Sequence, residues 1–434
     1  MDLLNDDIRK IYRHYLIASV GSALVVSVYS FVDTIAVGQS VGPMGAAAIA
    51  VINPMFALMV FLSVLCGVGG SVLMSVAKGK GNDEKGNAMF TAAVIMMTVI
   101  GAAMWLICFI FHEPIYRLFG ADDETLPYVL EYGMWLIYFF PAFIASTFLS
   151  SFLRNDGAPG LAMKAVVAGG LLNIFGDWFL CFPMDMGLKG AAIATVSGSC
   201  LQTLIMATHF FSKSCGLKLV MPGNVLKGCR RILSVGFGAG VLDLGTIALT
   251  VIINNRILKY GDVSALAVYG VVGTIGQLFQ AVFKGVGSSL QPIASRNFGA
   301  GRPERIKAVF RMSGFTTVVL GTIFMLSGEL FPVEITRLFV DATPEVIAAA
   351  PMIFRVYFTG FVFMGINVVS TYYLQSVMKD RDSMIVAMLR SIVLSGVLLL
   401  ILPPMFGLMG VFAAIPVAEL IVTLIAAGFN KRAL

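Results

Sequence analysis

Residues 15–37 read YLIASVGSALVVSVYSFVDTIAV, an apolar stretch with one charged residue, Asp33. A helix of about 20 such residues crosses the roughly 30 Å hydrocarbon core of a bilayer. The rest of the chain has the same character, because 58% of its 434 residues are hydrophobic and only 12% are charged. Its mean hydropathy is +0.90. The polar residues are too few to cover the surface of a protein surrounded by water, so the sequence predicts an all-α polytopic membrane protein.

Eleven further apolar stretches of similar kind follow the first one along the chain. Their continuous apolar character favours helices over barrel strands, in which polar and apolar residues would alternate. Twelve transmembrane helices are therefore predicted, over residues 15–37, 44–77, 88–111, 126–152, 161–182, 190–211, 232–257, 265–294, 309–330, 348–378, 384–402 and 410–429.

Basic residues set the predicted orientation. Most of the 30 Lys and Arg residues fall in every second loop and at the two ends of the chain. Cytoplasmic loops keep Lys and Arg, so both termini are predicted to be cytoplasmic in a bacterial-type plasma (inner) membrane. The first 13 residues are polar and do not resemble a cleavable signal. The net charge of +6 follows from this topology and does not indicate nucleic-acid binding.

The two halves of the chain repeat each other. Residues 115–119 (IYRLF) recur as 335–339 (ITRLF), and residues 187–190 (GLKG) recur as 407–410 (GLMG), both displaced by 220. An even number of spans gives both halves the same polarity, so an axis along the membrane normal should relate them. We predict two six-helix lobes, residues 1–212 and 232–434, joined by a cytoplasmic connector over residues 213–231. A substrate path is expected between the lobes.

Polar side chains gather in the outer part of the first lobe. Asp33 lies on the first span, Asn173 and Asp177 lie four residues apart on one face of the fifth, and Thr195 lies in the second turn of the sixth. An ionisable group at membrane depth is a functional candidate, and such oxygen ligands suit a proton or Na+. The corresponding residues of the second half are apolar, namely Ile253, Val393, Val397 and Ile415. This asymmetry predicts an ion-coupling site in the first lobe.

Other intramembrane polar residues leave alternatives open. Asp243 and Glu419 either bind a cationic substrate or neutralise basic residues of the second lobe. Those basic residues are Lys284, Arg355 and Arg390. The side chains predicted to line a substrate cavity are Tyr29, Asp243, Asn254, Gln277, Asn367 and Arg355.

Several motifs resemble those of the multidrug and toxic compound extrusion (MATE) family, in the same order along nearly the whole chain. They are VDT at residues 32–34, GKGND at 79–83, RNDGAP at 154–159, GLKGAAIAT at 187–195 and FGAG at 298–301. The resemblance implies a V-shaped antiporter that exports organic compounds against inward flow of H+ or Na+. It is nearest to the DinF-like branch, whose first-lobe site matches Asp33, Asn173, Asp177 and Thr195. NorM-like members also have acids on helices seven and ten, where this chain offers Asp243 about a turn away and Asn367.

The predicted function is secondary active export of small organic compounds, cationic or amphipathic, by a monomer in the lipid bilayer. An ion gradient must drive it, because the chain lacks a phosphate-binding GxxxxGK[ST] loop, and no cofactor other than H+ or Na+ is expected. The alternative is a flippase for lipids or lipid-linked saccharides, with Lys284, Arg355 and Arg390 in a basic cavity. Motifs of membrane-embedded hydrolases are missing from the sequence, which argues against an enzyme. A passive channel is a further alternative, and it would be favoured by a flux that ignores an imposed pH or sodium gradient.

Overall fold

The chain folds into helices throughout the part that the structure describes. This computed structural model describes residues 2–221, 223–340 and 343–433, apart from the side chains of residues 243, 244 and 246–248. The first half holds α1 (Ile8–Val41), α2 (Pro43–Gly79), α3 (Asp83–Ile110), α4 (His112–Leu118), α5 (Leu126–Tyr138), α6 (Phe140–Asn155), α7 (Pro159–Cys181), α8 (Gly187–Ala207) and η1 (Thr208–Phe211). The second half holds α9 (Val225–Tyr260), α10 (Val263–Gly299), α11 (Pro303–Leu330), α12 (Pro332–Phe339), α13 (Pro344–Phe358), α14 (Gly360–Ser376), α15 (Asp380–Met388), η2 (Leu389–Val393) and α16 (Leu394–Ala433).

These helices accommodate the predicted twelve crossings. Among the described residues, nine helical units are long and apolar enough to span a membrane, and the α5–α6 pair, bent by 56°, makes a tenth. The 36-residue α9 adds a further crossing. The last unit, residues 380–433, is 54 residues long and is interrupted at Gly407, whose φ of 58° is not helical, so it forms two crossings. The prediction of twelve transmembrane helices in two lobes is confirmed.

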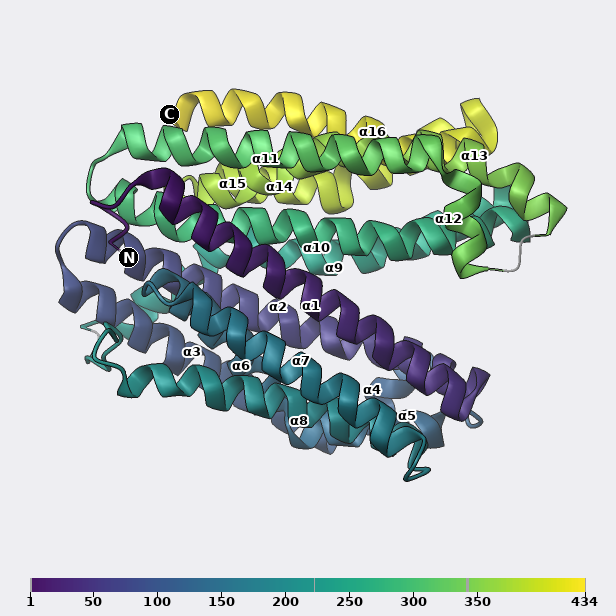
Figure 1. Cartoon of the computed structure of the whole chain (residues 1–434), viewed down its shortest axis with the longest axis horizontal. Helices are drawn as coiled ribbons and strands as arrows, with labels where there is room; N and C mark the ends of the chain where they lie inside the picture. Colours follow the sequence, from purple (N-terminus) through teal and green to yellow (C-terminus); the bar gives the residue numbers. More distant parts are fainter. Residues whose placement is uncertain (1, 222, 341–342, 434) are drawn as a thin grey trace.

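The internal repeat is visible in the architecture. The short helix α4 before the broken span α5–α6 has its counterpart in α12 before α13–α14, about 220 residues later. Figure 1 shows the first half of the chain, in purple to teal, as one lobe and the second half, in green to yellow, as the other. The lobes converge at the end where both termini lie and diverge at the opposite end. The molecule therefore has the V shape that the resemblance implied.

Two glycines let the lobes touch at the closed end of the V. A Cβ atom on Gly79 of α2 would collide with the carbonyl oxygen of Arg296 on α10. In the reciprocal contact, a Cβ atom on Gly299 would collide with the carbonyl oxygen of Val76. Gly79 and Gly299 are 220 residues apart and so occupy equivalent places in the repeat. Small residues of this kind allow helix backbones in a membrane to approach closely.

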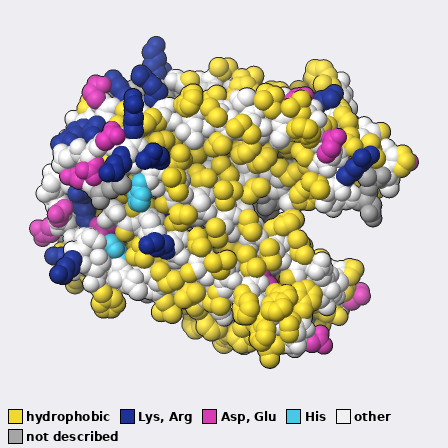
Figure 2. Space-filling model, viewed as in Figure 1, with side chains coloured by type: hydrophobic (Ala, Val, Ile, Leu, Met, Phe, Trp, Pro, Cys, Tyr) yellow, Lys and Arg dark blue, Asp and Glu magenta, His cyan; other side chains and the backbone are white. Residues whose placement is uncertain are grey.

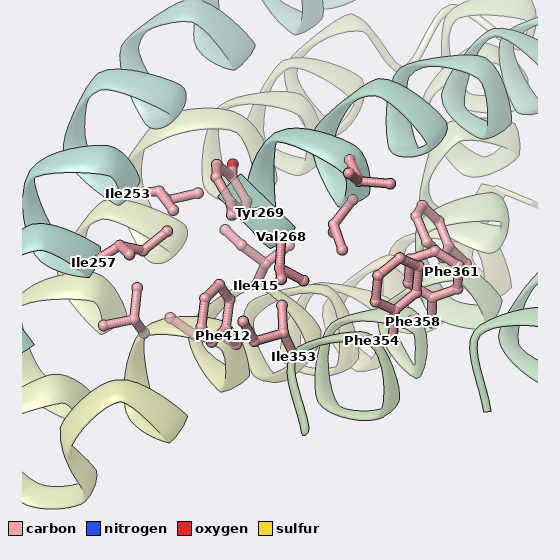
Figure 3. Close-up of a cluster of buried hydrophobic side chains, with 14 of the residues drawn as sticks. Ile253, Ile257, Val268, Tyr269, Ile353, Phe354, Phe358, Phe361, Phe412 and Ile415 are labelled. Carbon is pink, nitrogen blue, oxygen red and sulfur yellow. The ribbon is translucent and has the colours of Figure 1, made fainter. Parts of the chain in front are cut away.

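Each lobe has an apolar core of its own. In the second lobe, Phe354, Phe358 and Phe361 pack together, Phe412 lies in the same core near Ile353, and all four phenylalanines are buried (Figure 3). In the first lobe, Tyr116, Tyr132 and Phe140 are the corresponding large buried rings. Aromatic side chains bury much apolar area and prefer edge-to-face contacts, such as the 85° pair of Phe358 and Phe361. A further apolar cluster packs Tyr15 of α1 against Leu290 of α10 and so joins the two lobes.

A buried ion pair lies inside the second lobe. The Arg390 Nη2 atom lies 2.7 Å from Glu419 Oε1, and both side chains are 3% exposed. Arg390 belongs to the π-helical turn η2, and Asn367 completes the network by donating to Glu419 Oε2 at 2.7 Å. Of the two roles left open by the sequence, Glu419 therefore has the neutralising one.

We expect Glu419→Ala to destabilise the protein by about 3–5 kcal/mol, because it leaves the Arg390 charge buried without its counterion. Unfolding of the purified protein in mixed micelles, followed by circular dichroism, measures this loss. The double variant Glu419→Ala with Arg390→Met should recover most of the stability. If the single and double variants unfold alike, the pair does not carry the stability assigned to it.

Candidate ion-coupling site and central cavity

Close packing of α7 against α8 builds one wall of the predicted ion site. A Cβ atom on Gly169 of α7 would lie 2.6 Å from the carbonyl oxygen of Gly198 on α8, and one on Gly198 would lie 2.7 Å from that of Gly169. Asn173 and Thr195 each lie about one turn from these glycines. The amide of Asn173 consequently reaches the hydroxyl of Thr195 and donates to it at 3.2 Å.

Asp33 of α1 joins this wall through both carboxylate oxygens. Thr195 donates to its Oδ1 at 3.2 Å, and the Tyr132 hydroxyl of α5 donates to its Oδ2 at 3.4 Å. Tyr132 and Thr195 are also 3.2 Å apart, oxygen to oxygen. The structure thus brings Asp33, Asn173 and Thr195 into one hydrogen-bonded network with Tyr132. The four side chains come from α1, α7, α8 and α5.

Asp177 lies one turn further along α7 and is fully buried. Neither of its carboxylate oxygens has a hydrogen-bond partner in the described part of the chain. No Lys or Arg among the described residues forms an ion pair with Asp177 or Asp33. An ionised carboxylate in such a place is costly, and a bound proton or cation removes the cost.

A cavity of about 550 Å³ lies between the lobes and reaches this network. Asp33, Asn173 and Thr195 form part of its first-lobe wall, and Tyr29 lines it as predicted. Figure 2 shows the cleft between the lobes opening at the end opposite to the termini. Most of the Lys and Arg side chains on that face gather at the closed end. The cavity is large enough for a small organic molecule.

The other predicted cavity residues are divided between the cavity and places away from it. Gln277 lines both the central cavity and a smaller neighbouring pocket of about 350 Å³, which Asn254 also lines. Asn367 is instead buried in the second lobe, where it bonds Glu419. Asp243 lies outside the described residues.

The placement of Arg355 in the cavity is corrected by the structure. Its side chain is 58% exposed and lies 3.7 Å from Glu329 of the neighbouring helix α11. It is not among the residues that line the central cavity. The physical reason is that an exposed arginine near a helix end keeps its charge in a polar region and avoids burial.

Sequence reasoning missed two residues of this region. Tyr132 completes the hydrogen bonds of Asp33, and Arg154 lines the inner end of the central cavity. No signal in the sequence separates Tyr132 from other aromatic residues of apolar spans. Arg154 was expected in a loop, but α6 continues to Asn155, and this extra helical turn carries the side chain to the cavity.

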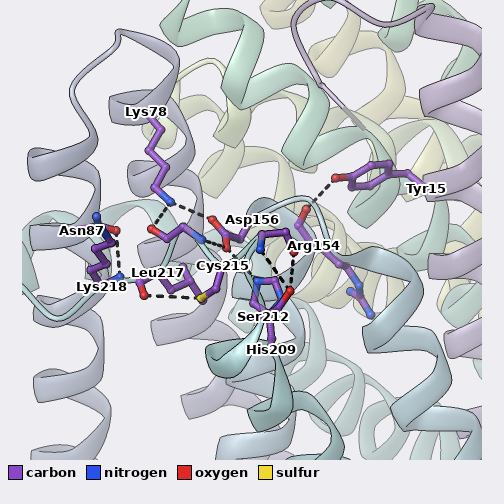
Figure 4. A network of polar contacts seen from close by, with 12 residues as sticks. Tyr15, Lys78, Asn87, Arg154, Asp156, His209, Ser212, Cys215, Leu217 and Lys218 are labelled. Atoms are coloured by element: carbon purple, nitrogen blue, oxygen red, sulfur yellow. Dashed lines mark hydrogen bonds and ion pairs between the residues drawn. The ribbon is translucent and has the colours of Figure 1, made fainter.

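A polar cluster fastens the chain between the lobes to the closed end (Figure 4). Lys78 of α2 and the backbone N–H of Gly216 donate to Asp156 at 2.9 and 2.8 Å, and His209 Nε2 lies 2.9 Å from the same carboxylate. Cys215 is close enough to form a possible metal-ligand group with Asp156 and His209. Because the Lys78 ammonium already neutralises Asp156, we assign the cluster a structural role. The boundaries of the connector remain a prediction.

The sequence matches a known family of proteins over most of its length. The model of the MatE family matches residues 18–179 and 244–401. The chain belongs to the MatE family. This MatE chain is 25% identical to the multidrug export protein MepA of Staphylococcus saprophyticus, over 95% of its own length and 91% of the relative. It is 24% identical to MepA of Staphylococcus haemolyticus, over 96% and 92% of the two chains.

Solved structures agree with the fold. A MATE crystal structure in complex with MaL6 superposes on this MatE chain with a TM-score of 0.92 at 19% identity, covering 99% of this chain and 97% of the other. A transporter of the MOP superfamily from Pyrococcus furiosus superposes with a TM-score of 0.91 at 20% identity, covering 99% and 96%. The family expected from the motifs is confirmed, whereas the DinF-like branch remains a prediction. Members of this family are multi-pass membrane transporters.

Proposed function

We propose that this chain exports small organic compounds in exchange for H+ or Na+, with Asp33, Asn173, Asp177 and Thr195 as the ion-coupling site. The observation that carries the proposal is a pair of buried carboxylates without a basic partner, one of which also lines the central cavity. The carboxylates need a neutralising ion, and the cavity can hold a solute beside them. The multidrug export activity named for MepA supports this reading of the cavity.

Coupling follows if ion and substrate favour different conformations. In the form described here the cavity opens away from the termini. Lys and Arg at the closed end support cytoplasmic termini, so this form faces the outside. Protons or Na+ ions that enter from outside neutralise Asp33 and Asp177, weaken the binding of a cationic substrate and favour closure of the outer end. The lobes then rock to open the inner end, and substrate binding there favours the return.

Transport by purified protein in liposomes tests this function. A fluorescent cation such as rhodamine 6G is trapped inside vesicles that have a higher concentration of H+ or of Na+ outside than inside. The two gradients are imposed one at a time. We expect one of the two gradients to drive dye movement against its concentration. Movement that is equal with and without both gradients would identify a passive channel and contradict the proposal.

The flippase alternative depended on three basic residues in the cavity. Arg390 is paired with Glu419, and Arg355 lies near Glu329 at an exposed position. Of the three, Lys284 lines the central cavity. We therefore favour export of soluble organic compounds.

A further inference from the structure

The inner end of the central cavity carries positive charge from the first lobe. Arg154, near the end of α6, lines this end, and its Nε atom is buried without a hydrogen-bond partner in the part of the chain that the structure describes. No carboxylate in the described part of the chain forms an ion pair with its guanidinium. Figure 4 shows its side chain pointing away from Asp156, its neighbour in the sequence. Asp156, the nearest acid along the chain, thus pairs with Lys78 and His209 and does not pair with Arg154.

A second donor without a partner lies on the opposite wall. Gln291 of α10 belongs to the second lobe and is 3% exposed, and its Nε2 atom has no hydrogen-bond partner among the described side chains. It lines the same cavity as Arg154, together with Lys284 from the same helix. An N–H group left without an acceptor in a buried place is destabilising, and a charged one is more so. Both donors therefore call for an acceptor that the described chain does not supply.

An oxyanion meets the needs of these groups. Arg presents several N–H donors in a planar fork that fits a carboxylate, sulfonate or phosphate, and a primary amide adds a further N–H. A cation would be repelled at this end of the cavity, whereas Asp33 at the other end would attract one. The cavity is thus polarised along its length, with its acid in the outer part and Arg154 at the inner end.

We propose that Arg154 and Gln291 bind the anionic group of an amphipathic substrate, so that the transported class includes zwitterions and organic anions. This inference rests on the proposed export function and adds the substrate chemistry of its cavity. Because Arg154 belongs to the first lobe and Gln291 to the second, a bound oxyanion bridges the two lobes. Such a bridge holds the inner end closed until the substrate leaves.

A matched pair of dyes tests the site. Rhodamine B carries a free carboxylate, and its ethyl ester has the same ring system without that charge. Fluorescence anisotropy with purified protein in nanodiscs of phosphatidylcholine measures the affinity of each dye. We expect wild-type protein to bind rhodamine B more tightly than the ester. Arg154→Gln should weaken rhodamine B binding by about tenfold or more, the effect of losing a charge-assisted hydrogen bond, with a much smaller change for the ester.

Two control variants make the result specific. Arg154→Lys keeps the charge and should recover part of the preference for rhodamine B. Arg355→Gln removes an arginine away from the cavity and should leave both affinities at their wild-type values. Equal loss of both dyes in Arg154→Gln, or no preference for rhodamine B in the wild type, would overturn the anion site.

Two further measurements separate the site from neighbouring questions. If wild-type protein exports the ester along an ion gradient but Arg154→Gln shows no selective loss, the anion site is wrong and the export function stands. If no gradient drives transport of either dye, the export function itself is wrong. Nanodiscs containing phosphatidylglycerol show whether a lipid phosphate competes with rhodamine B. Competition would support the oxyanion site and identify a headgroup as one of its ligands.

Discussion

Asp33→Asn is expected to abolish ion-driven efflux while leaving the helices folded. The amide keeps the size of the carboxylate and can still bond Thr195 and Tyr132, so the local packing survives. It can neither take up a proton nor offer a charge to Na+, so ion binding is lost. Efflux of rhodamine 6G from liposomes under each imposed gradient measures the effect. Asp177→Asn should behave in the same way, because it removes the other buried carboxylate.

Asp123→Asn is the matched control for these variants. Its carboxylate is 92% exposed and pairs with Arg117 on the surface. We expect its transport rate and its melting temperature to equal those of the wild type. Equal ion-driven transport by Asp33→Asn, Asp177→Asn and the wild type would remove this site from the mechanism.

Gly79→Leu is expected to block transport by forcing the lobes apart at the closed end. The atoms that a side chain would meet, the Arg296 carbonyl oxygen and the Gly299 Cα, belong to the backbone of α10 and cannot rotate away. The conformation with this end closed is therefore destabilised relative to one with it open. The measurement is the transport rate in liposomes, together with the labelling rate of a cysteine placed at Ser75, a buried position on α2, in a background without native cysteines. Labelling should become faster as transport falls.

The repeat supplies a second test of the glycine contact. Gly299→Leu should reproduce the loss, because its Cβ atom would meet the Val76 carbonyl oxygen in the equivalent place. Gly314→Leu, on α11, is the control, since nothing lies within 4 Å of a Cβ atom there. Wild-type transport and labelling in Gly79→Leu would show that the lobes do not need this contact.

Several features of the fold could be predicted because they depend on composition and repetition. Span lengths follow from bilayer thickness, and the 220-residue displacement fixes the two-lobe plan. The breaks at Phe139 and Thr359, which split two predicted spans, could not be placed from hydropathy, because the chain stays predominantly apolar on both sides of each break. The two breaks are 220 residues apart and so occupy equivalent places in the repeat.

The candidate site was predictable only in part. Asp33, Asn173 and Asp177 stand out because charged and amide side chains are rare at membrane depth, and Thr195 was added because it lies at a similar depth. Tyr132 does not stand out, because an aromatic residue suits any apolar helix and its contact with Asp33 arises from the packing of α5. Arg154 was expected in a loop but lines the cavity, and Arg355 was expected in the cavity but is exposed. Hydropathy does not show where a helix ends or which side of it faces the cleft.

The central claim is that ion and substrate compete through Asp33 and Asp177, and proton or sodium release measures it most directly. Rhodamine 6G is added to purified protein, either in weakly buffered Na+-free solution with a pH indicator or in the presence of radioactive Na+. The wild type should release H+ or Na+ as the dye binds, and Asp33→Asn and Asp177→Asn should release neither. Release by these variants equal to that of the wild type would contradict the account.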